Sequence, residues 1–164
     1  MTADELIKYF NMKPLPDEGG YYIETYRSSE KISGLPNRYD GPRNFSTAIL
    51  YLITPTSFSK LHRVKSDEIF HFYLGDAVEM LKISDNGKIK IEILGTDILK
   101  NQKPQVVVEK NIWQGTKLTP GGKFALLGCT VAPGFEFSDY ESGSKEKRIQ
   151  QFPPHLKKYI ENYT

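Results

Sequence analysis

The sequence predicts a mainly antiparallel β fold, a sandwich or a barrel, with one short helix at each end. Nine short runs rich in aromatic and β-branched residues fill the middle of the chain, and turn-forming residues separate them. No helical pattern lies between these runs. Parallel strands would need crossover helices, so the strands are expected to be antiparallel. The 164 residues suit one domain, so no second domain is expected.

A short amphipathic helix is expected to open the chain. Thr2 and Glu5 have the spacing of a capping box, in which each side chain binds the backbone N–H of the other residue. Apolar side chains then recur at helical spacing over residues 6–10. Pro14 ends this pattern, and Gly20 marks a turn into the first strand.

The predicted strands follow one another up to residue 131. They cover residues 21–27, 46–54, 58–64, 68–74, 78–84, 88–94, 105–109, 112–118 and 123–131. The sequence Asp85-Asn86-Gly87 predicts the clearest hairpin, because Asn-Gly readily supplies the positive φ angles of a type I′ turn. Residues 28–44 contain two glycines and two prolines and predict a long loop, of the kind that often forms a lid or an interface.

A second short helix is predicted near the end of the chain. Pro153 and Pro154 precede four apolar or aromatic residues at helical spacing, namely Leu156, Tyr159, Ile160 and Tyr163. Proline suits the first turn of a helix because its missing N–H is not needed there.

The charge pattern argues against capture of nucleic acid. There are 22 basic and 20 acidic residues, scattered through the chain, for a formal charge of +2. The one basic cluster, Lys145, Lys147 and Arg148, is interpreted as a solvated stretch. No apolar run approaches the roughly 18 residues of a membrane span, and the first ten residues lack a leader pattern. With Cys129 as the single cysteine, a cytoplasmic protein without a disulfide or a membrane partner is expected.

The residues best suited to chemistry lie in one segment. Two of the three histidines, His62 and His71, occur there together with Asp67 and Glu68. Imidazole and carboxylate groups can hold a metal ion or share general acid and base roles. Because side chains alternate along a strand, Glu68 and His71 should face opposite sides unless a bulge intervenes. We therefore expect His71 at an interface or in a satisfied hydrogen bond rather than beside His62.

This segment resembles the first motif of the cupins. His62, Glu68 and Gly75 fit the frame of that motif, but Val64 stands at its second histidine position. Alignment of Trp113-Gln114 with the second cupin motif places Gln114 at a ligand position. Valine cannot bind a metal ion and glutamine is a poorer ligand than imidazole, so no tightly bound metal and no other cofactor is predicted.

Longer runs of the chain resemble one branch of the cupins, the family called DUF985 or cupin 5. The runs are Glu18-Gly19-Gly20-Tyr21-Tyr22, Glu24-Thr25-Tyr26-Arg27-Ser28, Ser66-Asp67-Glu68-Ile69, His71-Phe72-Tyr73, Trp113-Gln114 and Gly128-Cys129-Thr130-Val131-Ala132-Pro133-Gly134-Phe135. The likeness covers about residues 6–140 and leaves 141–164 as a C-terminal extension with the short helix. It implies a double-stranded β-helix jelly roll over a single cupin domain, homodimers, and fold similarity to sugar-nucleotide epimerases and plant storage proteins. It implies no established reaction.

The leading hypothesis is a small-molecule-binding cupin that acts as a metal-independent epimerase or isomerase on a sugar or nucleotide sugar. His62 and Glu68 are the candidate proton-transfer groups, because removal of a proton next to a carbonyl needs a base and a donor. Gln114 would orient the substrate and Arg27 would contact an anion. Trp113 and His71 complete the candidate ligand-binding residues. For Gln114 and Trp113, packing in the core with a hydrogen-bonded indole is an equal alternative to substrate contact.

Two alternatives stay open. In the first, the barrel is a non-catalytic binding or oligomeric module, and His62 is simply hydrogen-bonded to a structural carboxylate. In the second, the protein is a metal-dependent cupin enzyme that uses His62, Glu68 and His71. Burial of Glu68 among Phe70, Phe72 and Trp113 would raise its pKa unless the carboxylate is paired, and this would suit a general base.

Overall fold

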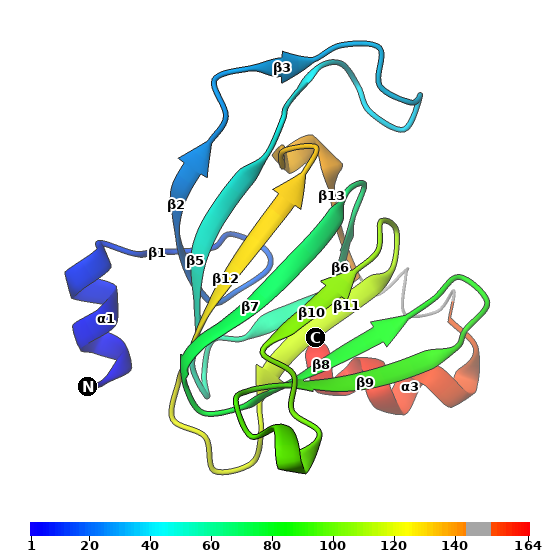
Figure 1. Ribbon diagram of the computed structural model, residues 1–164. Helices are drawn as coiled ribbons and strands as arrows, with labels where there is room; N and C mark the ends of the chain where they lie inside the picture. The colour runs from blue at the N-terminus through cyan, green and yellow to red at the C-terminus, as the bar shows by residue number, and fades with distance from the viewer. Residues whose placement is uncertain (144–151) are drawn as a thin grey trace.

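Two antiparallel sheets form the body of the computed structural model, which describes residues 1–143 and 152–164 (Figure 1). The first sheet has the strand order β1-β2-β5-β12-β7-β10 and the second the order β13-β6-β11-β8-β9. The first sheet consists of β1 (Lys13–Pro14), β2 (Tyr21–Arg27), β5 (Thr47–Ile53), β12 (Ala125–Ala132), β7 (Asp67–Gly75) and β10 (Gln105–Val108). The second consists of β13 (Tyr140–Ser142), β6 (Ser59–Val64), β11 (Trp113–Leu118), β8 (Val78–Ile83) and β9 (Ile89–Leu94).

All nine predicted strands are present, and every pairing between named strands is antiparallel. The sequence patterns missed four very short strands, β1, β13, β3 (Lys31–Ile32) and β4 (Arg43–Asn44). The last two pair with each other, so the ends of the predicted loop at 28–44 form a small ladder. The basic cluster at 145–148 lies outside the described residues.

The predicted hairpin around Gly87 joins β8 to β9, but its turn differs from the expected type. Gly87 has a φ of +77°, whereas Asn86 is not among the residues with positive φ. The backbone N–H of Gly87 donates to the carbonyl oxygen of Ser84. The backbone N–H of Ser84 donates to the carbonyl oxygen of Lys88. The type I′ prediction is therefore wrong, because one left-handed residue in a longer loop is enough to close the hairpin.

Side chains from both sheets meet in the central core, which fixes how the sheets face each other. The first sheet contributes residues such as Phe70 and Leu127, and the second contributes Met80 and Leu94. Leu81, next to Met80, belongs instead to a cluster on the outer face of the second sheet. This alternation is the normal consequence of the two-residue period of a strand.

The two predicted helices cover the outer faces of the two sheets (Figure 1). In α1 (Ala3–Phe10) the capping box is formed, with Thr2 N donating to Glu5 Oε2 at 2.7 Å and Glu5 N to Thr2 Oγ1 at 3.3 Å. The C-terminal α3 (Pro154–Ile160) and the 3-10 turn η3 (Glu161–Tyr163) pack on the second sheet. Two more 3-10 turns are η1 (Ile98–Lys100) and η2 (Phe137–Asp139). None of the described helices is long and apolar enough to cross a membrane.

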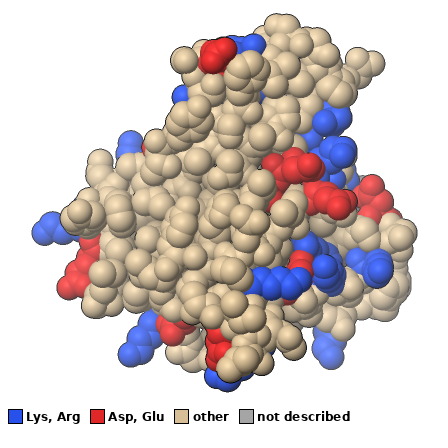
Figure 2. Space-filling view, viewed as in Figure 1, with Lys and Arg blue, Asp and Glu red and all other residues tan. Residues whose placement is uncertain are grey.

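The outer face of the first sheet is poor in charge. Figure 2 shows few charged side chains over the region where β5, β12 and β7 lie in Figure 1. Three large apolar or aromatic side chains on this sheet are about half exposed, namely Tyr26 at 54%, Tyr73 at 52% and Val107 at 46%. The sheet thus presents apolar surface beside its edge strand β10.

Candidate functional site

A cavity of about 280 Å³ lies inside the barrel and is bounded mainly by the first sheet. Its outer end is marked by Phe137, which is 58% exposed, and its inner end by Glu68, which is 7% exposed. Most of the wall is apolar or aromatic. The side chains with polar groups are those of Glu18, Tyr22, Glu24, Arg27, Thr47, Tyr51, Glu68, Cys129, Glu136 and Tyr140.

Strand geometry brings three predicted site residues together at the inner end. His62 of β6 and Gln114 of β11 are opposite one another in the second sheet, and both are almost fully buried, at 1% and 0% exposed. The amide nitrogen of Gln114 donates a hydrogen bond across the barrel to Glu68 Oε2 on β7. The two sheets are therefore linked at this point by the polar group that sequence reasoning selected.

The ring of His62 is held on both sides. Its Nδ1 lies 2.8 Å from the carbonyl oxygen of Lys60, which can only accept, so Nδ1 carries a hydrogen. Its Nε2 faces Glu18, 3.7 Å from Oε2. The ring of Tyr140 stacks on it at 5.3 Å between centroids, and Glu18 Oε1 accepts from Ser59 Oγ at 2.8 Å. His62 is thus fixed in one orientation with Nε2 directed to a carboxylate.

Burial sets the protonation of Glu68. Loss of solvent raises the pKa of this carboxyl from 4.5 to about 7, with His62 opposing the rise and Glu18 adding to it. Hydrogen bonds from Gln114 and from the Cys129 thiol, whose Sγ is 3.7 Å from Oε1, also favour the charged form. A carboxyl with a pKa near neutrality can both take up and release a proton at physiological pH.

Arg27 lies at the outer end of the same cavity, and all five of its N–H groups are engaged. Nε and Nη2 donate to the two carboxylate oxygens of Glu24, at 3.0 and 2.8 Å. Nη1 donates to Asn44 Oδ1 and to Glu136 Oε1, both at 3.0 Å. The second N–H of Nη2 donates to the carbonyl of Phe135 at 3.2 Å. The guanidinium, which has five donors in total, has none left for a ligand anion unless one of these bonds breaks.

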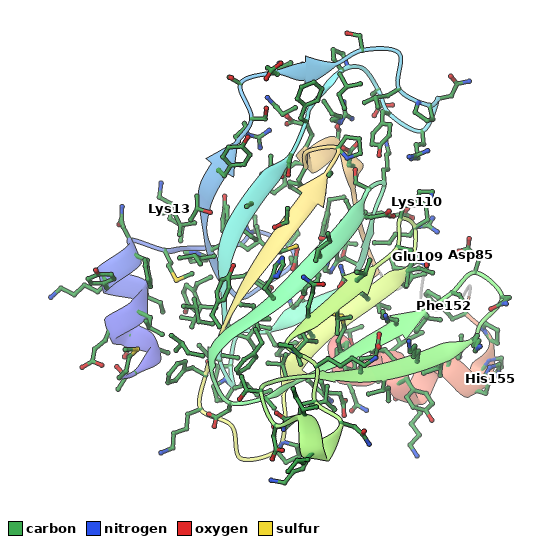
Figure 3. All side chains as sticks on the ribbon, viewed as in Figure 1. Lys13, Asp85, Glu109, Lys110, Phe152 and His155 are labelled. Carbon is green, nitrogen blue, oxygen red and sulfur yellow. The ribbon has the colours of Figure 1, made fainter. Side chains whose placement is uncertain are left out.

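Trp113 and His71 do not lie in this cavity. Trp113 precedes Gln114 on β11 and therefore faces the opposite side of the sheet, where it packs against the C-terminal helix. Its ring meets that of Phe152, labelled in Figure 3, at 5.6 Å between centroids. His71 shares the outer face of the first sheet with Tyr73 and lies 3.3 Å from Gln105 Nε2. The expectation from strand parity that His71 is separated from His62 is met, but Trp113 does not surround Glu68 as expected.

Sequence reasoning missed two residues of the site, Glu18 and Tyr140. Glu18 precedes Gly19 and Gly20, whose φ angles are +95° and +71°. This turn brings Glu18 against β6, where Lys60 N donates to its carbonyl oxygen at 2.9 Å. The Glu-Gly-Gly run was the available signal, because such glycines commonly mark a tight turn. No local pattern indicated Tyr140, since its place depends on β13 pairing with β6.

A buried ion pair outside the cavity supports its wall. Arg43 donates from Nε and Nη2 to the two oxygens of Asp139, both at 2.7 Å, and the Asp139 side chain has no exposed surface. Asp139 ends η2, and Tyr140 follows it directly. The pair thus ties β4, which precedes β5, to the segment that carries Tyr140 into the cavity.

A comparison with models of protein families shows to which family the chain belongs. Residues 4–143 match the family described as Cupin superfamily (DUF985). The chain belongs to this family. The resemblance predicted over residues 6–140 is confirmed. An uncharacterised protein of Saccharomyces cerevisiae is 31% identical over 134 residues, which cover 75% of this chain and 66% of the yeast protein. The chain thus spans slightly less than two thirds of that relative's length.

Solved structures support the same fold. A hypothetical protein from Leishmania major matches with a TM-score of 0.90 and 27% identity, covering 100% of this chain and 99% of the other. A protein from Shewanella oneidensis gives 0.87 and 30%, covering 100% and 98%. A variant of oxalate decarboxylase from Bacillus subtilis gives 0.58 and 13%, covering 95% and 38%, which shows the shared cupin fold alone. The predicted fold class is confirmed.

The residues at the cupin metal position do not fit a tightly bound transition metal. Val64 lies two residues after His62 on β6 and is buried, so a methyl-bearing side chain occupies the place of a second imidazole. Gln114 directs its amide nitrogen, which cannot bind a metal ion, to Glu68. Within the parts of the chain that the structure describes, no three histidine, cysteine or acidic side chains are grouped to hold a metal ion.

Proposed function

We propose that this cupin binds a small molecule in the barrel cavity and moves a proton to or from it through Glu68. The observation that carries the proposal is a carboxyl that is 7% exposed, lines the cavity and has its pKa raised to about 7. A buried group with such a pKa at the wall of a cavity is typical of a catalytic acid or base. The reaction class supported best is epimerisation or isomerisation next to a carbonyl, without a metal ion.

The other groups of the inner end suit this chemistry. Glu68 would take the proton, and the hydroxyl of Tyr140, whose pKa is raised by burial, would stay protonated and donate to the developing oxyanion. His62 lies behind Glu68 and Tyr140 and would act through them as a positioning group. Gln114 would hold the Glu68 carboxylate in place through its hydrogen bond.

The size of the cavity limits the ligand. Small-molecule sites commonly measure roughly 300–1,000 Å³, and this cavity of about 280 Å³ lies just below that range. A monosaccharide-sized group suits this space. The remainder of a nucleotide sugar would have to lie outside the cavity, beyond the exposed side chain of Phe137.

A non-catalytic binding module is the second candidate function. The observation in its favour is that His62 and Gln114 are not part of the cavity wall, so that Glu68 alone of these three residues can touch a ligand. In this case the raised pKa of Glu68 would serve recognition of a polar group rather than turnover.

Deuterium exchange separates the two candidates. The protein would be incubated in D₂O with a panel of neutral and amino monosaccharides in their carbonyl forms, and exchange at carbon would be followed by NMR. We expect exchange with the unmodified protein and none with Glu68→Gln, while Glu109→Gln, an exposed carboxylate outside this cavity, retains it. Binding without exchange would favour the non-catalytic module. Neither binding nor exchange with any member of the panel would contradict the proposed function.

A further inference from the structure

The charges of the cavity wall are strongly unequal. Among residues 1–143 and 152–164, four carboxylates line it, those of Glu18, Glu24, Glu68 and Glu136, whereas Arg27 is the only arginine or lysine that does so. All five N–H groups of the Arg27 guanidinium already donate hydrogen bonds to neighbouring residues. An anionic ligand would therefore meet negative charge without a free N–H of Arg27 to receive it.

The imbalance is greatest at the inner end. Glu24 and Glu136 both bind Arg27 directly, which leaves Glu18 and Glu68 with His62 as the nearest ionisable base. Only one nitrogen of His62 faces these carboxylates, because Nδ1 is bound to the carbonyl of Lys60. The buried Glu68 and the partly buried Glu18, whose side chain is 13% exposed, thus share at most one positive charge. Glu18 and Glu68 repel each other when both are ionised, which is reflected in the higher pKa of Glu68.

The rest of the wall also suits a cation. Six aromatic rings line the cavity: Tyr22, Tyr51, Phe70, Phe135, Phe137 and Tyr140. The faces of aromatic rings attract cations, and the attraction grows when water is excluded. The hydroxyls of the tyrosines and the inner carboxylates can accept hydrogen bonds from an ammonium group, which has donors only.

We propose that the natural ligand of this cavity carries a cationic amine, whose ammonium group binds at the inner end beside Glu18 and Glu68. An amino sugar combines this group with the small hydroxylated body that the cavity volume suits. The inference rests on the proposed function, because it names the ligand class of the same site. A preference for a cationic amine would distinguish this cavity from sites that bind phosphate or carboxylate groups.

Cys129 provides a direct probe of the electrostatic potential in the cavity. It is the single cysteine of the chain, it lines the cavity, and its Sγ lies 3.7 Å from Glu68 Oε1. The rates of its modification by aminoethyl, methyl and sulfonatoethyl methanethiosulfonate would be measured and divided by the rates with a free thiol. This division corrects for the intrinsic reactivity of each reagent. The corrected rate of the cationic reagent is then divided by that of the anionic reagent. Burial slows the reaction of Cys129 with both reagents, so this effect cancels in the ratio.

We expect this ratio of corrected rates, cationic over anionic, to be about 10 or more. The carboxylates of a poorly solvated site attract the cationic reagent and repel the anionic one. Glu18→Gln and Glu68→Gln should each lower this ratio, and the exposed control Glu109→Gln should leave it unchanged. A ratio equal to that of the free thiol would overturn the inference. The inference would also be overturned if none of the three reagents modified Cys129 in the folded protein while all three did so in urea. The inner end of the cavity would then be closed to ligands.

Binding measurements distinguish failure of this inference from failure of the proposed function. Glucosamine, glucose and glucuronate would be compared by calorimetry with the unmodified protein and with Glu18→Gln. We expect glucosamine to bind at least about 10-fold more tightly than glucose, and Glu18→Gln to remove that difference. Equal binding of glucose and glucosamine, lost in Glu68→Gln, would overturn the amine inference and leave the proposed function intact. A preference for glucuronate would overturn the inference outright.

Discussion

Replacement of Glu68 by glutamine should stabilise the protein at alkaline pH. The folded protein holds the Glu68 proton more tightly than the unfolded chain, because burial raises its pKa from 4.5 to about 7. The folded state therefore binds more protons between these two values, and stability falls as the pH rises through this window. The difference corresponds to about 3 kcal/mol once the pH is above 7, since each pKa unit is worth about 1.4 kcal/mol.

Glutamine avoids this cost while keeping the shape of the side chain. Its amide oxygen can still accept the hydrogen bond from Gln114, so the loss is limited to the charge-assisted part of that bond, about 1 kcal/mol. At pH 8 we expect Glu68→Gln to be about 1–3 kcal/mol more stable than the unmodified protein. Near pH 4.5, where the unmodified carboxyl is protonated in the folded state, the two proteins should be nearly equal in stability.

Urea unfolding at a series of pH values from 4.5 to 8 checks this directly. The difference between the two proteins isolates Glu68, because all other groups titrate in both. Glu109→Gln serves as the matched control, with a difference that stays small at every pH. A variant that is less stable than the unmodified protein at pH 8 would refute the reasoning, because it would mean that the ionised carboxylate is stabilised by its partners more than it is penalised by burial.

Three further predictions concern the wall, the assembly and the metal content. Arg43→Ala should lower stability by about 3–5 kcal/mol in urea unfolding, because it leaves the buried Asp139 carboxylate without its bidentate partner and only with Lys65, whose Nζ is 3.7 Å away; a loss no larger than that of Arg38→Ala, where a partly exposed arginine binds a backbone carbonyl, would contradict this. Light scattering should give the mass of a homodimer, since the first sheet exposes Tyr73 on a face poor in charge and leaves β10 as an open edge, and a monomer at high concentration would remove this prediction. Elemental analysis of protein purified without added metal should find well under one equivalent, because Gln114 offers its amide nitrogen to Glu68; a stoichiometric transition metal that survives a chelator would oppose it.

Part of the site could be predicted from the sequence because it depends on local rules. The alternation of side chains along a strand separated Glu68 from His71, and the cupin spacing selected His62, Glu68 and Gln114 as neighbours. The same alternation, applied to β11, would have placed Trp113 on the face opposite Gln114. The alignment with the second cupin motif had grouped these two adjacent residues, although adjacent residues of a strand face opposite ways.

The nine longer strands, the two helices and the family could be predicted from the sequence, because hydrophobic period, turn residues and motif spacing act over short stretches of chain. Only the tertiary structure decided the charge of the site. It brought Glu18 to His62 through long-range packing, and it surrounded Arg27 with acceptors up to 109 positions away in the sequence, as for Glu136. An arginine that looks free to bind an anion in the sequence is fully hydrogen-bonded in the fold, because the number of donors left for a ligand depends on neighbours that only folding brings together.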